Sequence, residues 1–181
     1  MHTKKIIALV CALSLLGACT VAGQSINSAA ALKAYLDKQP ANSPDQPITA
    51  VMNINEAMIE GILEVIWESG KYVSLDLACS PLTEIPDIAF AYCANIAGIT
   101  LPAGLTRIGD AAFSECTNIA AITIPAGVTA VGGSAFWGWT ASQTIIIEGK
   151  ANRDETIAAG WYDDGFYTWD AECNAVVVYK K

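Results

Sequence analysis

The chain has 181 residues, of which 53% are hydrophobic and 15% are charged, and its formal net charge is −8 at neutral pH. This composition supplies enough apolar side chains for a core and excludes a wholly disordered chain. The acidic balance excludes a surface that attracts nucleic acid phosphates or anionic headgroups.

The first 18 residues have the order of an export signal. Lys4 and Lys5 precede an apolar run over residues 6–16, and two small residues follow it. The run is too short to span a bilayer as a stable helix. Residues 1–18 are therefore predicted to be a signal peptide that is absent from the mature protein.

The stretch LGAC at residues 16–19 resembles the lipobox of bacterial lipoproteins. This resemblance implies that Cys19 carries lipid and that residues 19–27, which are mostly small or polar, form a tether above the membrane. The expected location is the cell envelope, on its periplasmic face or on the cell surface. An ordinary secretory signal with a chance cysteine is the alternative.

Residues 28–71 are predicted to form an N-terminal helical cap. The pattern predicts a short helix over 28–37, a loop over 39–47, a strand over 48–53 and an amphipathic helix over 53–70.

The amphipathic helix has one apolar side, which we expect to cover the exposed edge of the first repeat. Gly70 is suited to end it. The opposite side carries a ridge of glutamates at i+4 spacing, for which a solvated face and a docking stripe both remain open. The ridge consists of Glu56, Glu60, Glu64 and Glu68.

The centre of the chain contains an internal repeat of 23 residues. Residues 99–121 read ITLPAGLTRIGDAAFSECTNIAA and residues 122–144 read ITIPAGVTAVGGSAFWGWTASQT, with ten of 23 positions identical. Ten residues of the preceding row recur in the same register. Three consecutive rows predict a solenoid that is stabilised by stacking.

Each row opens with a predicted strand. Ile99 and Leu101 alternate with Thr100, so the apolar side chains would face inward. A proline at residue 102, and again at residue 125, ends the strand because proline has no amide for a ladder. Residues 72–148 therefore predict an α/β solenoid, a short arc with a parallel sheet.

The repeated Ala-Phe pair predicts a column of aromatic rings inside the convex side of the arc. Cys93 and Cys116 occupy equivalent positions, and buried free thiols are favoured because side chains on neighbouring coils usually lack the disulfide dihedral angle. Disulfides of Cys79 and Cys173 remain open, since an exported protein can form them.

The repeat, written x-I-P-x-x-V-T-x-I-G-x-x-A-F-x-x-C, resembles the leucine-rich repeats of the BspA type in bacterial surface proteins, including those of treponemes. The segments LKAYLDKQP at 32–40 and KYVSLDL at 71–77 also resemble the leader region of treponemal members. The resemblance implies a spirochaete-type surface lipoprotein that binds proteins, with adhesion to host matrix as one role.

Residues 149–181 are predicted to form a C-terminal β-rich cap, with further strands over 145–147 and 175–179. Between them, residues 161–170 carry five aromatic and three acidic residues. A sugar-binding surface and a plug that seals the last coil are both open interpretations. The sugar-binding surface would use Trp161, Phe166 and Trp169.

No catalytic constellation can be assembled from the mature chain. Removal of residues 1–18 takes away the only histidine, His2, and leaves 8 basic and 18 acidic residues, a net charge of −10. Ser-His-Asp, Cys-His and histidine metal sites are thereby excluded. No cysteine pair has zinc spacing, and no phosphate-binding glycine loop is present. We therefore expect no enzyme activity, metal or cofactor.

The leading hypothesis is a non-enzymatic, lipid-anchored leucine-rich repeat protein of the cell envelope that mediates protein–protein interaction. The small area of the arc predicts weak or multivalent binding and self-association. A carbohydrate-binding lipoprotein and a purely structural envelope protein are the alternatives. The expected contact surface is the outer face of the sheet with an Arg107–Glu84 pair at its side, and its residues are Asp76, Thr100, Thr123, Thr144, Ile146 and Arg107.

Overall fold

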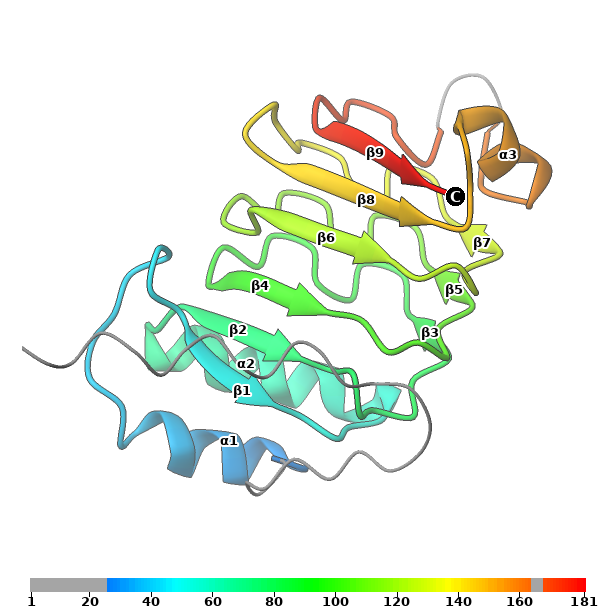
Figure 1. The fold of residues 1–181 in the computed structure, drawn as a ribbon. Coiled ribbons are helices and arrows are strands. Elements are labelled where there is room, and N and C mark those ends of the chain that lie inside the picture. Colours follow the sequence, from blue (N-terminus) through cyan, green and yellow to red (C-terminus); the bar gives the residue numbers. More distant parts are fainter. Residues whose placement is uncertain (1–25, 164–167) are drawn as a thin grey trace, which may run out of the picture.

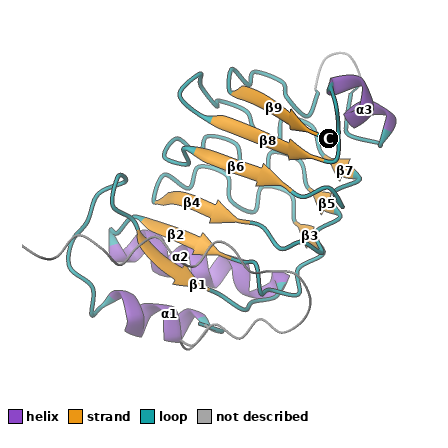
Figure 2. Cartoon of the chain, viewed as in Figure 1, coloured by secondary structure: helices purple, strands orange, loops and turns teal. Residues whose placement is uncertain are grey.

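The structure is a computed structural model that describes residues 26–163 and 168–181 as a stack of coils with three α-helices and nine β-strands (Figure 1). The helices are α1 (Ala29–Leu36), α2 (Ile59–Ser69) and α3 (Arg153–Ala158). The strands are β1 (Ile48–Val51), β2 (Val73–Asp76), β3 (Glu84–Ile85), β4 (Ile96–Thr100), β5 (Arg107–Ile108), β6 (Ala121–Ile124), β7 (Ala130–Val131), β8 (Thr144–Glu148) and β9 (Val176–Lys180). Figure 2 shows α1 and α2 at one end of the stack and α3 at the other.

Each of three consecutive coils contributes one longer strand and one two-residue strand, which pair in separate parallel sheets. The longer strands pair in the orders β1-β2-β4 and β6-β8-β9, and β4 lies next to β6, so together they line one face of the stack (Figure 1). The two-residue strands pair as β3-β5-β7 on another side. Ile108 pairs with Ile85 and Val131, each 23 positions away. The 23-residue period of the sequence is therefore the length of one coil.

The longer strands alternate as the sequence predicts. In β6, Ile122 and Ile124 are buried while Thr123 between them is exposed. Pro125 follows the last residue of β6, which agrees with its predicted role as a strand end. In the preceding coil β4 already ends at Thr100.

A column of phenylalanine rings fills the core, as the repeated Ala-Phe pair predicts. Phe113 stacks on Phe90 with ring centroids 5.4 Å apart and on Phe136 at 5.8 Å. Trp139 and Trp169 then meet Phe136 edge-on. Burying each phenylalanine contributes about 1.5–3 kcal/mol, and no ring could be covered within a single coil.

The helices near the N-terminus follow local capping rules. The Ser28 side chain accepts a hydrogen bond from the amide of Ala31 at 3.2 Å at the start of α1. Gly70 ends α2 with φ at 62°, a conformation that glycine adopts without strain. The predicted helix over 53–70 is confirmed, although helical structure begins only at Glu56, in a 3-10 turn before α2.

Two features were absent from the sequence prediction. The short strands β3, β5 and β7 lie in segments for which the pattern predicted no strand. Helix α3 is also new; Asn152 caps its start, and Arg153 bridges to Asp170 with 3.0 Å between Nε and Oδ2. The strands predicted at 145–147 and 175–179 are present as β8 and β9.

The parallel ladders and the regular period confirm a repeat solenoid. Within residues 26–163 and 168–181, no helix has the length and apolar character needed to cross a membrane.

Candidate functional site

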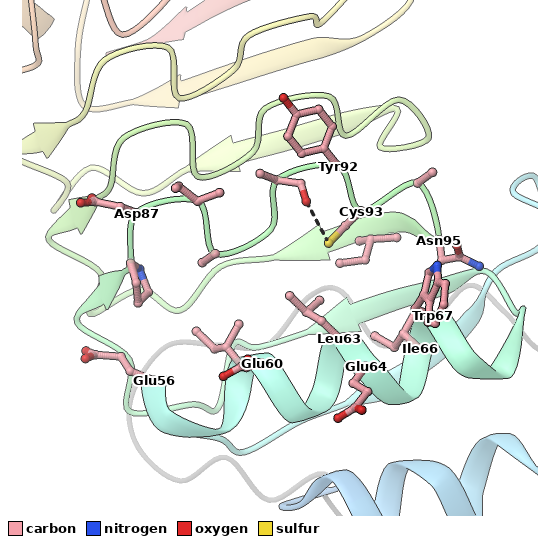
Figure 3. Close-up of a pocket in the computed structure, with 17 residues that line it drawn as sticks. Glu56, Glu60, Leu63, Glu64, Ile66, Trp67, Asp87, Tyr92, Cys93 and Asn95 are labelled. Atoms are coloured by element: carbon pink, nitrogen blue, oxygen red, sulfur yellow. Dashed lines mark hydrogen bonds between the residues drawn. The ribbon is translucent and has the colours of Figure 1, made fainter.

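A groove of about 900 Å³ separates α2 from the turn segment 86–96 of the first coil (Figure 3). Topology explains its position. The chain between β1 and β2 forms α2, whereas the chain between β2 and β4 forms the turn segment of a coil. A helix thus takes the place that a preceding turn segment would occupy, and it does not match the surface of the first coil closely.

Large apolar side chains stand exposed on both sides of this groove. Trp67 on α2 is 76% exposed, and Ile88 and Tyr92 on the turn segment are 63% and 73% exposed. Figure 3 shows Leu63 and Trp67 pointing from the helix toward the turn segment. Exposed apolar residues that gather around one hollow are typical of an interaction surface.

Ile88 and Tyr92 also sit on backbone that side chains rarely adopt. Their φ angles are 61° and 59°, in the left-handed region that is uncommon for any residue with a Cβ and worst for a β-branched one. The equivalent positions one and two coils later have the same backbone conformation but carry smaller or polar residues: Ala111 and Ser134, and Glu115 and Gly138. Among these three coils, only the one beside α2 places large apolar side chains there.

The rim of the groove is acidic. Glu56, Glu60 and Glu64 are exposed along the flank of the helix, and Asp87 lies on the opposite side (Figure 3). No lysine or arginine is among the residues that line it. The described residues also contain no group of three or more metal-ligating side chains. The groove therefore combines apolar walls with negative charge.

Asp87 is held by groups of the next coil. Its carboxylate accepts hydrogen bonds of 3.0 Å from the amide of Asp110 and from the guanidinium of Arg107. These hydrogen bonds, the Asp110 amide first, lower the pKa of Asp87 below its usual range. Arg107 also bridges Glu84, so the predicted Arg107–Glu84 pair is present.

The outer face of the sheet brings the predicted contact residues into two adjacent columns. Strand register places Asp76 opposite Thr100, and Thr123 opposite Ile146, in one column. Thr144 lies in the neighbouring column, opposite Ala121. Thr100 and Thr123 are exposed, but the Asp76 carboxylate already accepts a hydrogen bond from Ala78 at 3.0 Å. This face therefore offers mostly threonine side chains to a partner.

Two of the three aromatic residues predicted to bind sugar are in the core. Trp161 is 2% exposed and Trp169 is 0% exposed, and their rings meet edge-on with centroids 5.0 Å apart. Neither can offer an open ring face, so the prediction is wrong for both. They are buried because Trp169 closes the phenylalanine column at Phe136. Phe166 lies outside the described residues, as does Cys19.

The thiols of the repeats are not reactive groups. Cys93, Cys116 and Cys173 are free, as predicted for the first two, and Cys79 is disulfide-bonded. Burial raises the pKa of Cys93 to about 11 and that of Cys116 to about 12, so neither is a thiolate at neutral pH.

Sequence reasoning missed Trp67, Ile88 and Tyr92 as a group. A signal was available in the repeat. The later rows carry alanine and serine at the position of Ile88, and glutamate and glycine at the position of Tyr92. Positions that tolerate such different residues in later coils face outward. Several large apolar residues that gather at outward positions mark an interaction surface, whereas a single one does not.

Comparison with known proteins agrees with the repeat. Residues 80–157 match the family model described as BspA type Leucine rich repeat region, in six copies. No curated protein and no solved structure matches the chain. The match covers most of the predicted repeat region and supports a BspA-like leucine-rich repeat protein, a class whose repeat domains generally mediate protein interactions.

Proposed function

We propose that this chain is a non-enzymatic leucine-rich repeat protein that binds another protein through the groove between α2 and the first coil. One observation is the main reason for choosing the groove, rather than another surface, as the binding site. Ile88 and Tyr92 are large, exposed and held at positive φ, at positions where the later coils carry smaller or polar residues. The positive φ recurs in the later coils, so what distinguishes this coil is the large apolar side chains exposed on it, and such side chains gathered around a hollow are typical of a binding surface.

The outer face of the sheet is the second candidate surface, because strand register places Asp76 opposite Thr100 and Thr123 opposite Ile146. Its area is small, and none of its four residues named above lines the groove beside α2. We propose it as an auxiliary contact, which suits a weak or multivalent interaction and self-association.

The flanking segments are proposed to close the ends of the solenoid, with residues 28–71 as a helical cap and 149–181 as a β-rich cap. Buried side chains in both segments support this role. Ile62 and Ile66 of α2 are 1% and 2% exposed, and Trp169 completes the aromatic column at the other end. Terminal units of this kind keep the ends of a repeat stack from exposing its core.

The export signal over 1–18 and the lipobox-like LGAC at 16–19 support a lipoprotein anchored at the cell envelope through Cys19. Labelling of the expressed protein with palmitate tests this. Label on the wild type and none on Cys19→Ala is the expected result, and equal labelling of both would reject it.

At the envelope, the partner would be a protein of the host matrix or of the envelope itself, and the resemblance to treponemal surface proteins favours adhesion. The net charge of −10 after removal of residues 1–18 argues against nucleic acid as a partner. Binding of the purified protein to immobilised matrix proteins is the direct measurement of adhesion.

Site-specific photo-crosslinking tests the binding surface itself. A photoreactive amino acid is placed at Tyr92 or at Thr123 in the full-length protein in cells, and adducts are identified after irradiation. The groove predicts a protein adduct from Tyr92, reduced when Trp67→Ala is added. An adduct from Thr123 alone would move the site to the sheet face, and an adduct from neither position would reject both surfaces.

A further inference from the structure

The first coil presents backbone carbonyls to the groove that lack the partners found in later coils. Carbonyls of the second coil accept 2.8 Å hydrogen bonds from amides of the first, in the pairs Asp110 with Ile88, Ala112 with Phe90 and Ser114 with Tyr92. The equivalent carbonyls of the first coil belong to Asp87, Ala89 and Ala91, all of which line the groove. Among the described residues, those of Asp87 and Ala89 have no donor, and that of Ala91 receives only the Cys93 thiol, at 3.6 Å.

These carbonyls recur at every second residue of a turn segment, and the amides on one edge of an extended chain also recur at every second residue. An added extended segment would continue the inter-coil hydrogen bonding where α2 interrupts it. The side chains around this edge also favour a partner with hydrogen-bond donors, because the carboxylates of Glu56, Glu60 and Glu64 on the rim are acceptors. Lysine and arginine provide donors and the complementary charge.

The apolar walls set a second requirement. Trp67, Ile88 and Tyr92 leave large apolar areas open to solvent, and only apolar side chains of a partner would cover them favourably. A purely basic segment would leave these apolar side chains exposed to solvent, and a purely apolar segment would leave the carboxylates without cationic partners.

We infer that the groove takes an extended segment of a partner protein in which lysine or arginine alternates with apolar residues. The inference rests on the proposed function and names the chemistry of the partner. The segment adds its amides to the carbonyls of Asp87 and Ala89, places its apolar side chains against Leu63 and Trp67, and places its cations beside Glu60 and Glu64. An anionic membrane surface is repelled by the same carboxylates.

The test uses a fluorescent peptide of about ten residues with alternating lysine and valine, a length typical of a long strand. Its binding to the purified protein is measured by anisotropy. Two further peptides replace every lysine by glutamate, or carry N-methyl groups on alternate amides. The protein variants are Glu60→Gln/Glu64→Gln and, as a control with the same change in charge, Glu148→Gln/Asp154→Asn, which alters exposed acids beyond the repeats' first coil.

The lysine peptide is expected to bind, about tenfold more weakly to Glu60→Gln/Glu64→Gln and with little change to the control variant. The glutamate and N-methylated peptides are expected to bind at least about tenfold more weakly than the lysine peptide. Equal binding of the glutamate peptide, or an equal loss in the control variant, would overturn the cationic partner. Equal binding of the N-methylated peptide would overturn the extended ladder.

The outcomes separate this inference from the function beneath it. A protein adduct at Tyr92 together with no discrimination among the peptides leaves the groove as a protein site and rejects its cationic partner. Peptide discrimination without any adduct at Tyr92 in cells rejects the proposed function. Competition of unlabelled protein with the peptide, together with a dimer in sedimentation, would make a second copy the occupant and overturn a separate partner.

Discussion

The carboxylate of Asp110 accepts a hydrogen bond of 2.8 Å from the amide of Gly133, 23 positions further along the chain. Asp87 makes the same bond to the amide of Asp110 at 3.0 Å. An aspartate thus links the first coil to the second, and the second to the third, at the same point. The side chain of Asp87 passes over Gly109 to make this bond, and that of Asp110 passes over Gly132.

This crossing predicts a severe effect of Gly132→Ala. A Cβ at residue 132 would lie 2.5 Å from the amide nitrogen of Asp110 and 2.7 Å from the carbonyl carbon of Gly109, and backbone atoms cannot move aside cheaply. We expect a loss of about 1–3 kcal/mol in the free energy of unfolding, measured by urea denaturation. Gly104→Ala is the matched control, since a Cβ there meets nothing within 4 Å. A change in the control as large as in Gly132→Ala would contradict the steric argument.

The aromatic column predicts a larger loss from its middle ring. Phe113 is 0% exposed and stacks on both Phe90 and Phe136. Phe113→Ala should lower the free energy of unfolding by about 3–5 kcal/mol because it removes buried surface and leaves a cavity. Trp137→Ala, which truncates a side chain that is 38% exposed, should cost well under half as much. Thermal unfolding of the two variants compares them directly.

Sequence periodicity was sufficient to predict the coils and the phenylalanine column, because the 23-residue register places like residues one above another. It could not predict β3, β5 and β7, since two-residue strands have no alternation of their own. Helix α3 was missed because its six residues are too few to show an apolar period, and the ion pairs of Arg153 with Asp163 and Asp170 are not visible in a local pattern.

The candidate site was harder to predict than the fold for a related reason. The groove exists because α2 fits the first coil loosely, and that fit is a property of two packed surfaces rather than of either pattern. Composition suggested that aromatic residues next to acids, such as Trp161 and Trp169, would be exposed. In the structure the end of the phenylalanine column at Phe136 provides the apolar site that buries them.

Asp170 predicts a stability that depends on pH. Burial alone would raise its pKa, but hydrogen bonds from Arg153 at 3.0 and 3.2 Å and from Thr168 at 2.6 Å outweigh burial and lower it. A carboxylate with a depressed pKa contributes stability above its unfolded pKa of about 3.9, and this contribution is lost as the pH falls through the folded value. Asp170→Asn should therefore cost about 1–3 kcal/mol at pH 7.

The pH profile distinguishes this effect from simple misfolding. The difference between wild type and Asp170→Asn should be constant above about pH 5 and should shrink below about pH 4. Asp45→Asn, a change in an exposed loop, should stay within about 0.5 kcal/mol of the wild type at neutral pH. A difference for Asp170→Asn that does not shrink in acid would show that its carboxylate charge is not what stabilises the fold. Urea denaturation at a series of pH values measures both variants.

Ile88 predicts a trade-off between stability and binding. Its backbone has φ at 61°, which costs roughly 1–2 kcal/mol for a residue with a Cβ, and its side chain is 63% exposed and recovers little of that cost by packing. Ile88→Gly should therefore stabilise the fold by about 1 kcal/mol despite the greater entropy of glycine in the unfolded chain. Ile88→Ala separates the causes, because it removes the apolar side chain and keeps a Cβ on the strained backbone. Both variants should weaken the binding of a partner to the groove. Only Ile88→Gly should raise the free energy of unfolding, because only glycine relieves the strain at positive φ. An Ile88→Gly variant that is less stable than the wild type would mean that the exposed side chain stabilises the fold, and its exposure would then not be evidence of a binding role.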